Sequence, residues 1–165
     1  MNYYITYSQQ IINKITVLII LFTSCSQNNQ NEKVDWLGRV LVLPEVTSNQ
    51  NKIVVRFEGD CPACVRSIDE WKKFVESIKI KNEELKFVFY IESVRIETFN
   101  VIKEKLYFID YVINDYQATF FRKNLLKYPF NIEDQTFLLN EKNQILLIGN
   151  PIIKKQLTAK YLRKV

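Results

Sequence analysis

The sequence KIVVRFEGDCPACVRSIDEW, residues 52–71, changes from a strand pattern to a helix pattern at a pair of cysteines. Ile53–Phe57 is a short run rich in β-branched residues, and a glycine follows soon after it, so the run predicts a strand that ends in a turn. Apolar residues then recur at spacings of three and four, which predicts an amphipathic helix with Pro62 in its first turn, where proline's missing N–H has no cost. Cys61 and Cys64 therefore lie where a strand leads into a helix.

The rest of the chain alternates between short apolar runs and helical periodicity. Runs of β-branched and aromatic residues predict strands, and apolar residues three and four positions apart predict helices. Two runs separated by a turn rich in Asn and Lys predict a hairpin near the carboxyl terminus. In chain order the expected elements are strands at 40–43 and 53–57, a helix from 62 to about 79, a strand at 85–91, a helix at 96–106, a strand at 109–113, a helix at 117–126, hairpin strands at 136–139 and 145–148, and a closing helix around 157–162.

Composition favours a single globular domain and excludes several kinds of site. The 165 residues are 47% hydrophobic and include only 3 glycines and 4 prolines, which is typical of a chain that buries one core. The formal charge of +5 comes from basic residues scattered among acidic ones, so no nucleic-acid surface is expected. The sequence has no histidine, which excludes Ser-His and Cys-His catalytic pairs and imidazole metal ligands. Cysteine and carboxylate chemistry are left.

Residues 1–24 resemble a bacterial lipoprotein signal peptide. The apolar run Ile15–Phe22 is shorter than the roughly 20 residues that span a bilayer, and small residues and a cysteine follow it. Leu21–Cys25 is similar to a lipobox in the relaxed form of Bacteroidetes lipoproteins, which implies cleavage before Cys25 and attachment of lipid to its sulfur. A simple secretory leader and an uncleaved apolar tail are the alternatives. In the first interpretation the chain consists of a signal peptide (1–24), a lipidated cysteine with a polar tether (25–33) and a folded domain (34–165).

The segment Lys52–Lys164 resembles a thioredoxin-like domain, because a strand, a helix that begins with CxxC, further strands and helices, a hairpin and a last helix follow in the family's order. Trp36–Arg39 and Asp134–Pro151 are similar to the corresponding segments of Bacteroidetes thioredoxin-like lipoproteins. The resemblance implies an α/β fold, a three-layer α/β/α sandwich with a central mixed sheet. It also implies a lipid-anchored protein of the bacterial cell envelope, facing the periplasm, that exchanges disulfides with exported proteins and needs no cofactor.

Cys61 and Cys64 are the candidate catalytic residues. A thiol at the amino-terminal end of a helix has a lowered pKa, so Cys61 is expected to be the nucleophile and Cys64, one turn later, the resolving thiol. The negative charge of Asp60 would raise the pKa of the neighbouring thiol and temper its reactivity. A structural disulfide on a fold used only for binding is the alternative. No metal is expected, because one CxxC supplies two ligands and a closed zinc site needs four.

The sequence departs from the family pattern at three positions. The resemblance places Gln135 where the family has a cis-proline before the strand that faces CxxC, and a cis peptide before a non-proline residue costs roughly 2.5–4 kcal/mol. It places Val55 where the family has a buried acid that transfers protons, and Asp60 where the family has an aromatic residue. Trp71 fits the apolar face of the helix and is expected in the core. Glu58 and Asp60 are expected to be loop carboxylates rather than an acid-base pair.

Overall fold

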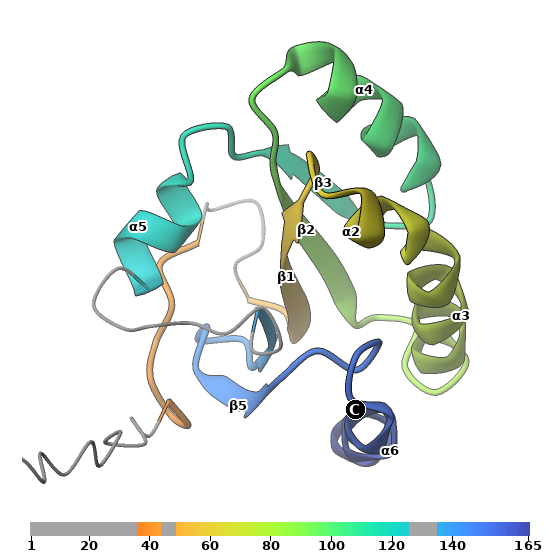
Figure 1. Cartoon of the computed structure of the whole chain (residues 1–165). Helices are drawn as coiled ribbons and strands as arrows, with labels where there is room; N and C mark the ends of the chain where they lie inside the picture. Colours follow the sequence, from red (N-terminus) through yellow and green to blue (C-terminus); the bar gives the residue numbers. More distant parts are fainter. Residues whose placement is uncertain (1–35, 44–48, 126–134) are drawn as a thin grey trace, which may run out of the picture. The chain divides into compact units, whose positions relative to one another are not determined.

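The computed structural model describes residues 36–43, 49–125 and 135–165 (Figure 1). The predicted signal peptide, Cys25 and the whole predicted polar tether precede the first of these ranges and lie outside the described residues. Within the described ranges, no helix has both the length and the apolar character needed to cross a membrane. The elements, in chain order, are β1 (Lys52–Glu58), α2 (Pro62–Arg66), α3 (Ile68–Lys79), β2 (Lys86–Glu92), α4 (Ile96–Lys105), β3 (Tyr111–Asn114), α5 (Thr119–Leu125), β4 (Thr136–Leu139), β5 (Ile145–Ile148) and α6 (Lys155–Lys164).

A five-stranded mixed sheet forms the centre of the fold, in the order β3-β2-β1-β4-β5. β1, β2 and β3 run parallel to one another, whereas β4 is antiparallel to both β1 and β5. Parallel neighbours need a crossover connection, which α2 and α3 provide between β1 and β2, and α4 provides between β2 and β3. β1 is therefore the middle strand, and its carboxyl end leads directly into the cysteine pair.

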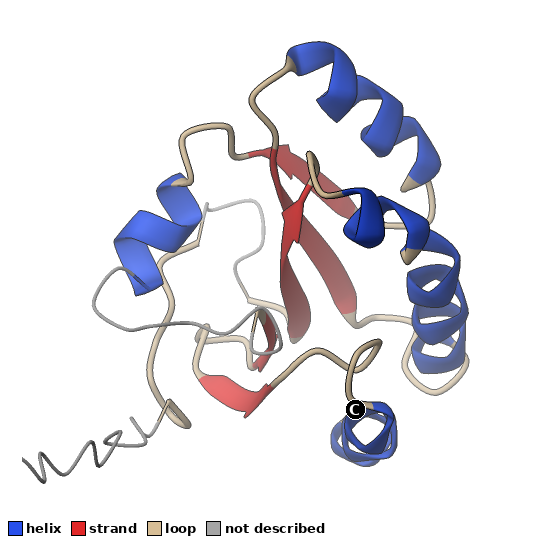
Figure 2. Cartoon of the chain, viewed as in Figure 1, coloured by secondary structure: helices blue, strands red, loops and turns tan. Residues whose placement is uncertain are grey.

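Apolar side chains cover both faces of the sheet. On one face, Trp71 of α3 is 2% exposed and meets Phe89 of β2 edge to face, with 5.1 Å between ring centroids. On the other face, Phe120 of α5 stacks on Tyr90 of β2 at 4.3 Å and shares a cluster with Val54. Helices therefore lie on both sides of the sheet (Figure 2), which confirms the predicted three-layer α/β/α sandwich and the core position of Trp71.

The hairpin strands are predicted correctly at 136–139 and 145–148, but the first predicted strand is wrong. The segment at 40–43 lies next to the turn that leads into β5, where the Leu41 N–H donates to the carbonyl of Asn143 at 2.9 Å. Its regular pairing is limited to one isolated bridge between Val40 and Gln144. One bridge does not make a strand, because a ladder needs consecutive pairs.

The predicted helix from 62 to 79 is two helices, α2 and α3, separated at Ser67. The Ser67 hydroxyl donates to the carbonyl of Cys64 at 2.7 Å, and its backbone has φ −81° and ψ 0°. A side chain that bonds its own helix backbone competes with the regular ladder, and periodicity does not reveal this. Two further boundaries also differ from the prediction. β3 begins at Tyr111 rather than at residue 109, and α5 begins at Thr119, whose N–H donates to the Asp115 carboxylate at 2.7 Å.

Candidate functional site

The loop between β1 and α2 places Cys61 at the start of a helix. Gly59 donates its N–H to the carbonyl of Glu92 at 2.7 Å, and a Cβ at this position would lie 3.1 Å from the same oxygen. Glycine is therefore what lets the loop pass so close to β2. Cys61 follows as the N-cap residue of α2 and Pro62 as its first helical residue, which confirms the location that the sequence predicts for both.

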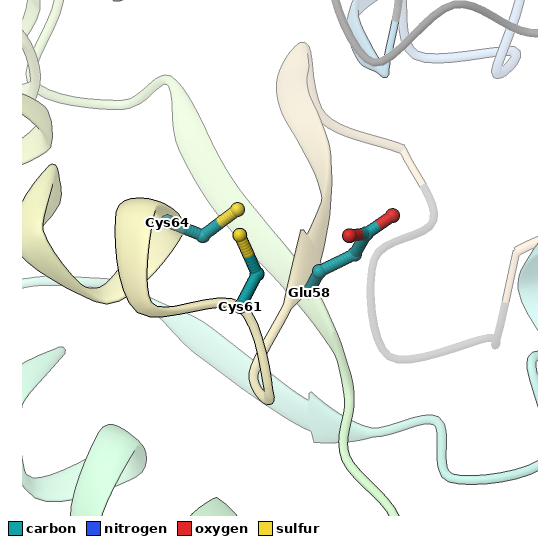
Figure 3. A group of neighbouring side chains, drawn as sticks. All are labelled: Glu58, Cys61 and Cys64. Atoms are coloured by element: carbon teal, nitrogen blue, oxygen red, sulfur yellow. The ribbon is translucent and has the colours of Figure 1, made fainter.

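The sulfurs of Cys61 and Cys64 lie side by side between α2 and the end of β1 (Figure 3). Both residues are free cysteines and both are partly exposed. The backbone N–H of Cys64, followed by its thiol, hydrogen-bonds the Cys61 sulfur and lowers the pKa of Cys61. Burial, followed by the bond to Cys61, raises the pKa of Cys64 to about 12. The pair therefore consists of one thiol that ionises readily and one that resists ionisation.

The carboxylate of Glu58 lies next to both sulfurs. In the described part of the chain, one of its oxygens and the two sulfurs lie within 4.8 Å of one another. Arg56 precedes Glu58 by two residues on the same side of β1, 3.4 Å from its carboxylate. Arg56 also binds Glu92 of β2 through two hydrogen bonds, from Nε at 2.5 Å and from Nη2 at 2.6 Å. The guanidinium is thus fixed by β2 and in turn holds Glu58 beside the cysteines.

Two thiols and a carboxylate are also donors that a zinc ion accepts. Cys61, Cys64 and Glu58 bring three such donors together, one short of the four that a closed zinc site needs, and the carboxylate already pairs with Arg56. The absence of a metal stays a prediction from the sequence.

Two cavities meet at the cysteine pair. One, of about 210 Å³, is lined by residues of β1, α2 and α3 and of the segment after β5, including Trp71 and Ile152. The other, of about 360 Å³, lies between the loops that follow β1 and β2 and is lined by Asp60 and Tyr116 among others. Cys61 and Glu58 line both cavities, so each cavity contains both the nucleophile candidate and the carboxylate.

Gln135 lies in the cavity that contains the two cysteines. It directly precedes β4, is 5% exposed, and lines the 210 Å³ cavity together with Cys61 and Cys64. Its carbonyl accepts the N–H of Arg56 at 3.0 Å, which fixes its backbone to β1. Among the described residues every peptide bond is trans, and Asp134, which precedes Gln135, lies outside them. The part that Gln135 plays in substrate docking stays a prediction.

The two other departures from the family pattern have different surroundings. Val55 is 1% exposed and packs in the apolar cluster between the sheet and α3. Asp60 accepts a hydrogen bond from the Ser93 hydroxyl at 3.0 Å and one from the Val94 N–H at 2.8 Å, and so ties the loop after β2 to the site. The carboxylate whose charge raises the pKa of Cys61 is that of Glu58, and the net shift is downward. The influence of Asp60 on this thiol stays a prediction.

Sequence reasoning missed the position of Glu58. The residue was expected in a loop, but it is the last residue of β1 and lies beside the sulfurs. One signal for this was present, since Arg56 and Glu58 stand two residues apart and side chains two apart in a strand share a face. Their partner Glu92 ends the neighbouring strand, and only the strand pairing brings it into register with Glu58.

No protein-family model matches the chain, and no curated protein matches it. Solved structures do match it. A thiol:disulfide interchange protein from Bacteroides sp. is 12% identical, with 77% of this chain and 86% of that chain covered and a TM-score of 0.51. A thiol-disulfide oxidoreductase from Bacteroides fragilis is 14% identical over 71% of this chain and 85% of its own, with a TM-score of 0.50. A secreted Mycobacterium tuberculosis disulfide oxidoreductase homologous to E. coli DsbE is 11% identical over 73% and 85%, again at 0.50.

At sequence identities this low, the similarity to the solved structures shows the fold alone. The mixed five-stranded sheet and its helices match the α/β fold of these structures, and this chain has its cysteine pair at the start of the helix that follows β1. The chain therefore has a thioredoxin-like fold, the fold of thiol-disulfide oxidoreductases, and it carries a CxxC pair formed by Cys61 and Cys64.

Proposed function

We propose that the chain is a thiol-disulfide oxidoreductase that acts on the thiols or disulfides of exported proteins. One observation carries the proposal: Cys61 lines two cavities, its thiol has a lowered pKa, and its sulfur lies beside the sulfur of Cys64. A thiolate that is accessible and has a second thiol within reach is what disulfide exchange requires.

In the reducing direction the reaction has two steps. The Cys61 thiolate attacks one sulfur of a substrate disulfide, and the other substrate sulfur leaves as a thiolate. The Cys64 sulfur then attacks Cys61 in the mixed disulfide, the second substrate sulfur leaves, and a Cys61–Cys64 disulfide remains. Two electrons pass from the protein to the substrate. The same steps in reverse oxidise a substrate dithiol, and the reduction potential of the pair decides the direction.

The test is reduction of insulin by the full chain in detergent. We expect the wild-type chain to accelerate precipitation of the insulin B chain, and Cys61→Ser to abolish this. Cys64→Ser should retain the first attack and accumulate a mixed disulfide with the substrate, which mass spectrometry detects. Equal precipitation rates for the wild-type chain and Cys61→Ser would remove the enzymatic hypothesis.

The second candidate is a binding protein whose cysteines form only a structural disulfide. Gln135 and Val55 favour it, because neither can act as the cis-proline or the acid that the family pattern has at these positions. The reduction potential of the pair separates the two candidates. Structural disulfides typically lie below about −300 mV, so a value above this supports exchange with substrates.

Location at the cell envelope is part of the same proposal. The sequence before Trp36 supports a lipid anchor on Cys25, and the secreted Mycobacterium tuberculosis protein offers a precedent for export of this fold. Labelled palmitate should enter the wild-type chain in a bacterial host and fail to enter Cys25→Ala. Equal incorporation into both would exclude Cys25 as the lipidated residue, and no incorporation into either would exclude a lipoprotein.

A further inference from the structure

We propose that Glu58 takes up and returns the proton of the Cys64 thiol during disulfide exchange, in place of the acid that position 55 lacks. The inference rests on the proposed function and names the residue that carries the proton in its second step. It assigns a chemical role to a side chain that the sequence analysis expected to be an ordinary loop carboxylate.

The second step needs a base because Cys64 resists ionisation. Its pKa is raised to about 12, first by burial and then by the hydrogen bond to Cys61. At pH 7 a thiol with such a pKa is ionised in only about one molecule in 10⁵. In the mixed disulfide the Cys61 sulfur is bonded to substrate and carries no charge, but the burial of Cys64 persists. The proton must therefore move to an acceptor as the sulfur attacks.

The geometry makes Glu58 that acceptor. A carboxylate oxygen of Glu58 lies within 4.8 Å of the Cys64 sulfur, a distance that one bridging water spans. The Glu58 side chain is 37% exposed and lines both cavities, so its proton can pass on to solvent or to the departing substrate sulfur. On the opposite side of β1, Val55 is surrounded by apolar side chains and offers no acceptor.

Several other charged groups lie around Glu58 and the two cysteines. Each of them either has bonding partners of its own or lies outside the group of atoms within 4.8 Å of one another. Arg56 lies 3.4 Å from Glu58 and is bound by Glu92 on β2, so its positive charge keeps the carboxylate in place. Asp60 is bonded to Ser93 and Val94. Glu70 of α3 lines the 210 Å³ cavity, and the charge of Asp115, which follows β3, acts on Arg56. Glu70 therefore serves as the control residue, since it has the same carboxylate in the same cavity.

The step balances as follows. The Cys64 S–H bond breaks and its proton joins the Glu58 carboxylate, while the Cys64 sulfur bonds to the Cys61 sulfur. The bond between Cys61 and the substrate sulfur breaks, and its electron pair leaves on that sulfur. The protonated Glu58 then gives the proton to the substrate thiolate or to water. The protein loses two electrons as a disulfide forms, and the substrate disulfide gains them.

The experiment follows the two steps separately with 5,5′-dithiobis(2-nitrobenzoate). Reduced full chain in detergent is mixed in excess with the reagent, in a Cys25→Ser background so that only Cys61 and Cys64 react. Attack by Cys61 releases the first thionitrobenzoate, and attack by Cys64 on the mixed disulfide releases the second. Each release is followed by absorbance in stopped flow across a range of pH.

Glu58→Gln should leave the first release unchanged or slightly faster and slow the second at least tenfold at pH 7, within the range of general-base effects. The difference in second-release rate between the wild-type chain and Glu58→Gln should become smaller as pH rises, because hydroxide then replaces the carboxylate as base. Glu58→Asp should recover part of the rate of the second release, and Glu70→Gln should not change the ratio between the rates of the two releases. The charge of Glu58 raises the pKa of both thiols, so a purely electrostatic role predicts the opposite, a faster second release in Glu58→Gln.

The outcomes separate this inference from the proposed function. If the wild-type chain gives both releases and Glu58→Gln does not slow the second, the role of Glu58 is refuted and the oxidoreductase stands. If both releases slow equally in Glu58→Gln, the residue acts on the fold and the inference also fails. If the wild-type chain never gives the second release, Cys64 does not resolve the mixed disulfide and both proposals fail.

Discussion

The two sides of strand β1 differ in chemistry although they are built from alternating residues of one short sequence. Val55 and Phe57 point into the apolar cluster beneath α3 and α4, with exposures of 1% and 3%. Arg56 and Glu58 point to the other side, where Arg56 binds Glu92, and the Glu58 carboxylate at the end of the strand lies beside the cysteine sulfurs. One side of the strand thus has no charge, and the charged side ends beside the cysteine pair.

The difference between the two sides explains how the site can lack an acid at position 55 and still hold a carboxylate. An acid at position 55 would approach the cysteines from inside the core, where it must be desolvated. Glu58 approaches from the end of the strand, where it is partly hydrated and paired with Arg56. The same functional group thus reaches the pair without a buried charge. The following predictions change one side of β1 at a time.

The largest effect is expected from Val55→Asp, which places an acid on the apolar side. An uncompensated buried charge should destabilise the fold by about 3 kcal/mol or more, measured by urea unfolding. Burial would raise the pKa of the new carboxyl above its unfolded value of about 3.9, so the folded state would bind more protons. The loss of stability should therefore be smallest below pH 4, where the carboxyl is protonated in both states, and grow as pH rises toward the folded pKa.

Val55→Asn is the matched control for this prediction. It has nearly the same volume and polarity as the aspartate variant but no titrating group, so its loss of stability should not follow the same pH dependence. If Val55→Asp is as stable as wild type at pH 7, the core can accept a charge at this position, and the contrast between the two sides of β1 is not a constraint of the fold.

A smaller effect is expected from Arg56→Gln on the charged side. The variant breaks two hydrogen bonds to Glu92 in a pair whose side chains are 15% and 18% exposed. We expect a loss of about 1–2 kcal/mol in urea unfolding, because bonds between charged groups that are mostly shielded from water are stronger than surface ion pairs. Glu92→Gln and the double variant complete a thermodynamic cycle. Additive losses would mean that the two groups do not interact, and Arg56 would then not be fixed by β2.

The parts of the fold that follow local pattern could be predicted from the sequence. The change of period at Cys61, the limits of β4 and β5, and the burial of Trp71 all follow from residues close in the chain. The break at Ser67 could not be predicted, because a serine in a helical pattern gives no sign of which carbonyl its hydroxyl will bond.

The candidate site was predictable only in part for a similar reason. The CxxC motif identifies Cys61 and Cys64 by itself. The position of Glu58 depends on the register of β1 with β2, which pairs Glu58 with Glu92 and brings the latter to Arg56, 36 residues earlier in the chain. The bonds of Asp60 to Ser93 and Val94 likewise join residues more than 30 positions apart in the chain. Contacts of this range are not encoded in a local pattern.

The smallest effect is expected on the pH at which Cys61 ionises. Backbone and thiol hydrogen bonds from Cys64 lower the pKa of Cys61, while the charge of Glu58 raises it by a lesser amount. The rate of Cys61 alkylation by iodoacetamide in a Cys25→Ser background should therefore be half-maximal below about pH 8.5, the value for a free cysteine. Removal of the negative charge in Glu58→Gln favours the thiolate, so the midpoint should move further down. Val55→Thr, a change on the apolar side, should leave it in place. A midpoint that rises in Glu58→Gln would mean that the carboxylate does not act on Cys61 through its charge, and the two sides of β1 would then differ in packing but not in their influence on the thiol.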